Sequence, residues 1–150
     1  MAKLTGDRIY YKVVQEYNGM THSCRTHSFL SPDLLQKMCL TYSVDEWTEP
    51  KIQYSKLFVF SNFEAAKKFA HMYSCTAIYS CYVRNPFRLK GIIPLCSLNL
   101  CNVKQMWKNR QNKKKYITHG VIEDLPKCTI GCDAIKLIKK VWNKFGINKE

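Results

Sequence analysis

Cysteine and histidine side chains are the groups in this chain best suited to holding a metal ion, and the sequence contains eight and four of them. The candidates that lie near one another or form a spaced pair are His22, Cys24, His27, Cys39, Cys128 and Cys132. Zinc usually takes such ligands from pairs two to four residues apart. On a strand, however, His22 and Cys24 share a face and His27 points to the other. Cys128 and Cys132 have no second pair at zinc-ribbon spacing, so we expect neither a metal site nor a cofactor.

A thiol paired with His71 or His119 would be the simplest nucleophilic arrangement. With eight cysteines and four histidines such pairs arise by chance, and no local context marks one thiol as activated. The adjacent acids Glu123 and Asp124 diverge on a strand instead of converging on a substrate. The chain also lacks a Walker, GxGxxG or GxSxG motif. We therefore expect no catalytic residue.

A basic segment with two aromatic residues is the strongest candidate binding site. It has no acidic residue between Asn102 and Ile122, and residues 108–115 form a polar run without apolar periodicity, typical of a loop. Phosphate contacts by its cations would give salt-dependent binding, and its aromatic rings would stack on bases. The alternative is a solvated lysine-rich loop without a ligand. The candidate residues are Lys104, Lys108, Arg110, Lys113, Lys114, Lys115, Trp107 and Tyr116.

The charge of the chain is concentrated in its second part. The net charge is +13, and residues 61–150 carry seventeen basic and five acidic side chains, which is +12. Such asymmetry predicts an anionic partner: nucleic acid, an acidic protein surface or anionic lipid. The start of the chain has no apolar secretory signal, and no run reaches the roughly 18 apolar residues of a membrane span. We expect a cytoplasmic or nuclear protein that is not secreted, with reduced cysteines.

The best determined element is a strand, helix and strand over residues 56–83. Residues 57–60 form an apolar run, and Ser61 and Glu64 are spaced as a capping box at the start of a helix. Apolar residues then recur at helical spacing up to Tyr73, and from Thr76 the period changes to two. Asn85 and Pro86 end the second strand. We expect this unit to be the rigid support of the molecule.

The remaining elements are arranged around this unit. Asn18-Gly19 between extended segments predicts a β-hairpin over about residues 8–29. A short helix after Ser31, a strand near 41–44, an acidic loop at 45–50, a helix near 103–109 and a strand at 116–122 follow. For residues 128–145 a strand and a helix compete, and Ile135, Ile138 and Trp142 favour a helix over 134–144. We expect a single compact α+β domain over 1–150, with a mixed or antiparallel sheet of five to seven strands and two to four short helices.

Several of these motifs carry a resemblance. With its opening strand at 11–14, the Asn18-Gly19 turn and the segments 47–50, 58–70 and 128–137, the chain resembles a small uncharacterised domain family of bacteriophage and large DNA virus proteomes. It departs from that pattern at Asp45, where Gly is expected, and in the order of Gly and Thr at 129–131. The resemblance implies a viral or phage protein, in which neighbouring virion proteins are further candidate partners.

A fainter resemblance is to the ADP-ribosyltransferase fold, carried by the strand and Ala-rich helix at 58–70. That fold implies a His or Arg on the first strand to hold NAD, where this chain has Tyr11 and Lys12. It also implies a catalytic Glu on a late strand, for which Glu123 is the available residue. The sequence therefore favours a non-enzymatic basic binding protein, and an NAD-using relative of that enzyme fold is the alternative.

Overall fold

The structure is a computed structural model that describes residues 8–17, 19–23, 40–51, 56–88, 92–94, 122–124 and 128–144. At Tyr17, 92–94 and 122–124 it describes the backbone alone. The expected helices near 31–38 and 103–109, the basic loop at 108–115 and the strand at 116–121 lie outside the described residues.

The described residues form mostly β-structure. A nine-stranded sheet, antiparallel at every pairing, contains β1 (Tyr10–Tyr17), β2 (Met20–Ser23), β3 (Thr41–Tyr42), β4 (Trp47–Thr48), β5 (Leu57–Phe60), β6 (Thr76–Arg84), β7 (Phe87–Arg88), β10 (Thr129–Cys132) and β11 (Ala134–Asn143). A two-stranded sheet pairs β8 (Ile92–Pro94) with β9 (Ile122–Asp124). The one helix of the described residues is α2 (Phe63–Ala70). The expectation of an α+β domain with five to seven strands and two to four helices is therefore wrong.

The central strand, helix and strand are confirmed as β5, α2 and β6. Both strands pair antiparallel with β1, which lies between them, so β5 and β6 run parallel to each other. The helix start differs from the expected capping box by one residue. Asn62 is the N-cap, and its side chain accepts a hydrogen bond from the Ala65 amide at 3.0 Å. Ser61 instead donates its backbone N–H to the carbonyl of Cys128, which fixes the end of β5 beside β10.

The β-hairpin at the start of the described chain is also confirmed. β1 and β2 pair up to Tyr17 opposite Met20, which leaves a two-residue turn. Gly19 has a φ of +75°, the conformation that a tight hairpin turn requires at this position and that glycine adopts without a steric cost. The Asn-Gly signal therefore predicted the turn, and the structure adds the register of the two strands.

The expected helix at 134–144 is wrong, because these residues form β11, the longest strand. β11 pairs with β6 from Ala134 opposite Arg84 to Asn143 opposite Ala77. The register shifts twice, between Leu137 and Lys139 and between Lys140 and Trp142. Each β-bulge adds one residue to the strand, so side chains on one face recur at intervals of three instead of two. The residues that favoured a helix, Ile135, Ile138 and Trp142, therefore lie on one face, at the first bulge and on the opposite face of β11.

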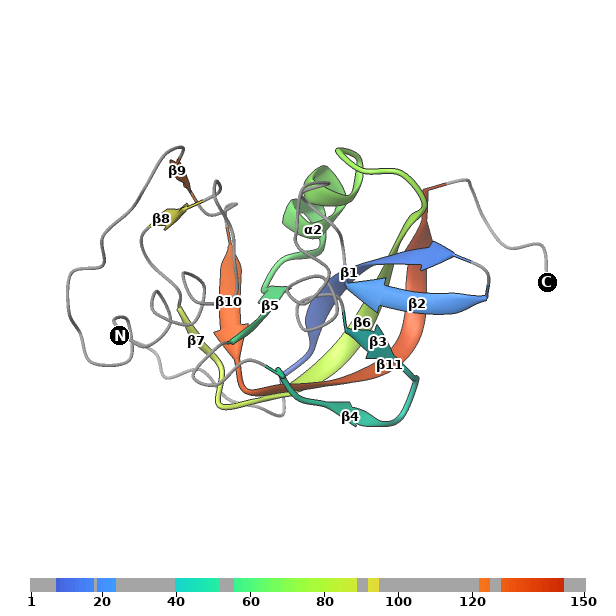
Figure 1. The fold of residues 1–150 in the computed structure, drawn as a ribbon, viewed down its shortest axis with the longest axis horizontal. Helices are drawn as coiled ribbons and strands as arrows, with labels where there is room; N and C mark the ends of the chain where they lie inside the picture. The colour runs from blue at the N-terminus through green and yellow to red at the C-terminus, as the bar shows by residue number, and fades with distance from the viewer. Residues whose placement is uncertain are drawn as a thin grey trace.

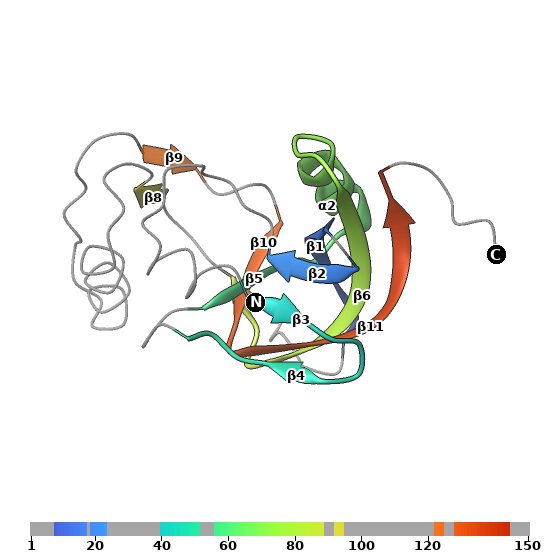
Figure 2. The ribbon, with the colours of Figure 1, turned by 45° about the vertical axis from the view of Figure 1, so that its right-hand side comes forward.

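The sheet branches at β1. One edge of β1 pairs with β6, while its other edge pairs near Tyr11 with β5 and over Val14–Tyr17 with β2. The β5–β10–β7 branch and the β2–β3 branch therefore diverge on the same side of β1 (Figures 1 and 2). One core cluster contains buried residues of both branches, including Tyr42 of β3 and Val59 of β5.

A second, smaller core lies under α2 on the opposite face of the sheet. Ala66 and Ala70 of α2 pack with Val13, Phe60 and Ile78, and all five are buried. Partly buried Tyr11, Phe63, Phe69 and Trp142 surround this cluster. The helix covers one end of this face, whereas β4 lies at the other end of the sheet (Figures 1 and 2). Among the described residues, no helix lies over the surface near β4.

Candidate anion-binding face

The basic segment singled out in the sequence lies outside the described residues, between β8 and β9 in the chain. The structure therefore assigns no position to Lys104, Trp107, Lys108, Arg110, Lys113, Lys114, Lys115 or Tyr116. The described sheet carries a different group of aromatic and basic side chains, on strands that the sequence patterns did not connect.

This group, here called the outer row, consists of Trp47 on β4, Lys136 on β11 and Tyr82 on β6. Lys136 lies directly opposite Trp47 on one side and directly opposite Tyr82 on the other. Residues in register on neighbouring strands point to the same face of a sheet, so the three side chains form a line across it. Trp47, on the two-residue strand β4 at the end of the sheet order, and Tyr82, near the end of β6, are 38% and 39% exposed.

Two further cations belong to the same face. Arg84 is two residues from Tyr82 along β6, and its guanidinium carbon lies 4.0 Å from the centroid of the Trp47 ring. Nζ of Lys136 lies 5.9 Å from the same centroid. Lys139, which is exposed, lies opposite Ser80 on the same face as Lys136. Trp47 is therefore contacted by two cations, as a ring with a negative π-face favours.

One acidic side chain approaches these cations among the described residues. Glu49 lies 3.8 Å from a nitrogen of Arg84, and the two side chains are 70% and 49% exposed. An ion pair so open to water contributes at most about 1 kcal/mol. On this face, here called the outer face, Lys136 and Lys139 form no ion pair with the described carboxylates, and they lie beside aromatic surface next to the acidic segment 45–50.

The row is held by the buried side of the same strands. Val83 and Ile135 lie opposite each other on the other face of the sheet, here called the inner face, which carries the larger core cluster. They are buried, at 2% and 0% exposure. Since alternate residues of a strand point to opposite faces, burial of these two directs Tyr82 and Lys136 outward. Trp47 is held by the two-residue pairing of β4 with β11. The acidic loop expected at 45–50 thus contains a short strand, β4, at Trp47–Thr48. A two-residue strand has no periodicity that a sequence pattern could detect.

The inner face carries a lysine and two cysteines, residue types that could act in catalysis, and the structure shows the packing and bonding of each. Lys12 is buried on β1, where its Nζ donates to the carbonyl of Phe58 at 2.9 Å and lies 5.5 Å from the centroid of Tyr42. Burial raises the pKa of the Cys81 thiol, and it raises that of Cys132 to about 12. Thiols with raised pKa values carry little thiolate near neutral pH and are poor nucleophiles.

A polar cluster at one end of the inner face is fully engaged. Glu16 accepts hydrogen bonds from Tyr79 at 2.7 Å and Thr21 at 3.3 Å, and Lys140 lies 2.8 Å from its other carboxylate oxygen. Burial raises the pKa of Glu16, but the bonds from Lys140 and Tyr79 lower it more, so the net shift is downward. Burial, followed by the bond to Glu16, raises the pKa of Tyr79 to about 12. The cluster joins β1, β6 and β11, and its hydrogen-bonding groups are used within the protein.

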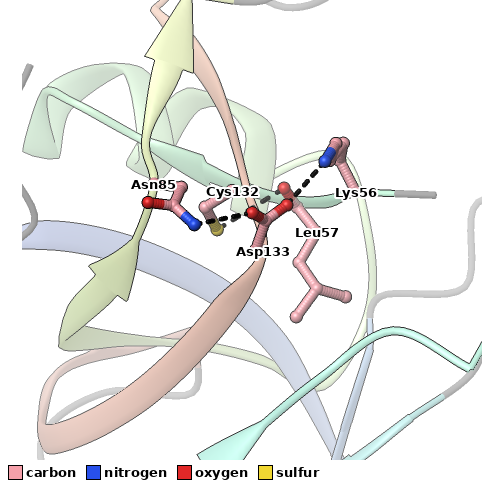
Figure 3. A network of polar contacts seen from close by, with 5 residues as sticks. All are labelled: Lys56, Leu57, Asn85, Cys132 and Asp133. Atoms are coloured by element: carbon pink, nitrogen blue, oxygen red, sulfur yellow. Dashed lines mark hydrogen bonds and ion pairs between the residues drawn. The ribbon is translucent and has the colours of Figure 1, made fainter. Parts of the chain in front are cut away.

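A second polar network lies where β10 meets β11. Nζ of Lys56 lies 2.6 Å from Oδ1 of Asp133, and the side-chain amide of Asn85 donates to Oδ2 at 2.9 Å (Figure 3). Burial raises the pKa of Asp133, but the hydrogen bonds from Lys56 and Asn85 lower it more, so the net shift is downward. Beside it, the thiol of Cys132 points to the carbonyl of Leu57 at 3.6 Å. This network connects the beginning of β5 to the turn between β10 and β11.

The described residues contain no group of three or more His, Cys, Asp or Glu side chains able to hold a metal ion. His71, a candidate partner for a thiol, instead lies edge-on to Trp142 with 5.1 Å between the ring centroids. Tyr11, the candidate NAD-binding position, is partly buried against Phe63 under α2. Glu123 lies on β9, in the separate two-stranded sheet. No described contact brings Tyr11 and Glu123 together.

In the part of the chain that the structure describes, no helix has the length and apolar character needed to cross a bilayer. Comparisons with protein-family models, curated proteins and solved structures find no match to this chain. The resemblances to the viral domain family and to the ADP-ribosyltransferase fold therefore stay predictions.

Proposed function

We propose that this chain is a non-enzymatic binding protein whose Lys- and Arg-rich surface contacts nucleic acid. The observation that carries the proposal is the set of cations on the outer face: Arg84, Lys136 and Lys139. Among the described residues, ion pairs engage Lys56, Arg84 and Lys140, and the Arg84 pair is long and exposed. Cations that are not neutralised by the protein's own carboxylates are available to an anionic partner.

The basic segment at 104–116 adds to this proposal. Its six cations and two aromatic residues carry the same combination of charge and stacking surface as the outer face. Each phosphate neutralised by Lys or Arg releases counterions, so binding through several such contacts weakens steeply as salt is added. The resemblance to a phage and large-DNA-virus domain supports a partner of this class, with an acidic virion protein as the alternative.

Retention on heparin and anisotropy of a labelled DNA, each measured over a salt series, test the proposal. We expect the logarithm of the DNA association constant to fall linearly with the logarithm of salt concentration. Substituting Lys136→Ala and Lys139→Ala together should reduce this slope by about one to two, since each phosphate contact contributes roughly 0.7 to 0.9. The matched control is Lys67→Ala with Lys68→Ala on α2, which removes the same charge from another surface.

The control pair should leave most of the slope in place. Absence of any salt-dependent binding by the unmodified chain at low ionic strength would exclude the proposal. Equal losses in the two double variants would show that net charge acts without a preferred surface, and would exclude the outer face as the contact.

A further inference from the structure

We infer that the outer row is a stacking platform for the bases of single-stranded nucleic acid, with Trp47 and Tyr82 as its aromatic surfaces. This inference rests on the proposed function and makes it more specific. The electrostatic proposal requires only cations, whereas this one requires the exposed rings between them.

The spacing of the rings fits separate bases on a strand. Trp47 and Tyr82 lie on β4 and β6, with β11 between them, so two strand spacings of about 4.8 Å separate their backbones. Lys136 lies in register with both, between the two rings. Its ammonium group is thus placed for a phosphate that connects bases stacked on either side.

The state of Trp47 also favours a base as its ligand. Arg84 lies over the ring at 4.0 Å, and 38% of the residue is still exposed. The guanidinium restricts the orientation of the indole, so less side-chain entropy is lost when a base stacks on the remaining surface. In proteins that bind single strands, replacing a ring on which a base stacks by alanine weakens binding roughly 5- to 150-fold.

A single strand fits this surface better than a duplex. The bases of a duplex are stacked on one another, and proteins usually reach their edges with an element inserted into a groove. The outer row is carried by three paired strands of a sheet, and no helix of the described residues lies over it. A duplex would meet the cations with its phosphates but leave Trp47 and Tyr82 unused.

Further exposed apolar surface lies at the start of β1. Tyr10 pairs with Cys81, the residue before Tyr82, and Ile9, which directly precedes β1, is 38% exposed. An acidic protein would match the charge of this face but would not require the exposed rings.

The test measures the affinity of the full chain for a labelled 15-nucleotide oligothymidine, an oligouridine of the same length, a DNA duplex and heparin. We expect tighter binding to the single strands than to the duplex at equal salt. Trp47→Leu keeps an apolar side chain but removes the aromatic ring, and it should weaken single-strand binding about tenfold. Trp47→Phe should retain most of the affinity, and heparin binding should not change with either variant.

Two further variants separate stacking from folding. Tyr82→Leu should also weaken single-strand binding without changing heparin binding. Because Tyr82 is outside both buried clusters, this variant should fold normally. Met72→Ala is the control, because Met72 is 70% exposed beyond the end of α2. It removes exposed apolar surface and should change nothing. Thermal unfolding of each variant checks that the sheet remains intact.

Each outcome decides between the two proposals. Equal affinity for single strands and duplex, with no effect of Trp47→Leu or Tyr82→Leu, would overturn the stacking platform and leave the electrostatic proposal standing. Binding of polyglutamate with the same salt dependence and the same indifference to Trp47 would assign the face to an acidic protein, and would also overturn it. Failure to bind any of the polyanions would overturn both. A difference between oligothymidine and oligouridine identifies the preferred nucleic acid.

Discussion

The hydroxyl of Tyr79 donates a hydrogen bond of 2.7 Å to the carboxylate of Glu16, and this contact connects β6 to β1 where the hairpin begins to separate from the sheet. Lys140 of β11 reaches the same carboxylate at 2.8 Å. Three neighbouring strands therefore share one ionised group. The charge of Glu16 is part of what holds these strands in register.

The stability of the protein should depend on pH through Glu16. Its pKa is lower in the folded chain than the ordinary 4.5, so the contribution to stability is complete above about pH 4.5 and is lost as the pH falls through the lowered value. We expect Glu16→Gln to reduce the free energy of unfolding at pH 7, with a difference from the unmodified chain that narrows below pH 4.5. Urea titrations at a series of pH values measure this. Glu46→Gln, at an exposed position, is the control, and a difference independent of pH would contradict the assignment.

The ion pair of Lys56 and Asp133 should contribute more than the exposed pair of Arg84 and Glu49. The first pair is 2.6 Å long and shares its carboxylate with Asn85, whereas the second is 3.8 Å long and lies in solvent. Asp133→Ala should lower the free energy of unfolding by about 1 kcal/mol, and Glu49→Ala should leave it nearly unchanged. Chemical unfolding of both variants compares them. Equal effects would show that the network in Figure 3 adds nothing to an exposed pair.

The cap of α2 is assigned to Asn62, and substitution tests it directly. Asn62→Ala removes the acceptor of the Ala65 amide and should cost about 1 kcal/mol. Ser61→Ala should cost less, because the serine hydroxyl lies 3.5 Å from the Cys128 carbonyl and caps no helical amide. Thermal or urea unfolding gives both values. A larger loss from Ser61→Ala would restore Ser61 as the cap.

The cysteines should differ in their reactivity with iodoacetamide. Cys81 and Cys132 are buried, with thiol pKa values that burial raises, whereas Cys75 and Cys128 are partly exposed. In the native protein at pH 8 we expect Cys75 and Cys128 to be labelled well before Cys81 and Cys132. Peptide mapping by mass spectrometry assigns each site, and the same reaction in denaturant should abolish the difference. Equal labelling of the buried pair in native protein would show that the inner face opens.

Local signals in the sequence predicted the elements that depend on local chemistry. Asn18-Gly19 predicted the hairpin, and the change of period at Thr76 predicted the boundary between α2 and β6. The predicted N-cap, Ser61, is one residue before the observed N-cap, Asn62, because both residue types are good N-caps. Ser61 is used instead by a contact with Cys128 that is distant in the chain. No pattern of neighbouring residues reports such a contact.

The missed features have the same origin. The apparent helical stripe consisted of Ile135, Ile138 and Trp142, of which Ile138 lies at the first register shift of β11 and Trp142 directly after the second. The outer row combines β4, β6 and β11, and its members become neighbours only through strand pairing. One signal was nevertheless present: Tyr82 alternates with Cys81 and Val83, so burial of these two on one face turns the Tyr82 ring to the opposite face. The basic segment at 104–116 remains a sequence prediction, because it lies outside the described residues.

The pairing of β6 with β11 also affects how the protein is made. On the ribosome, β6 is complete long before residues 85–133 have been synthesised, and β11 is the last of the described strands to emerge. Until then the nascent chain exposes the open edge of a nine-residue strand to other extended polypeptides. Production should therefore benefit from slower translation at low temperature and from chaperones that shield strand edges, and overproduction at 37 °C should favour inclusion bodies.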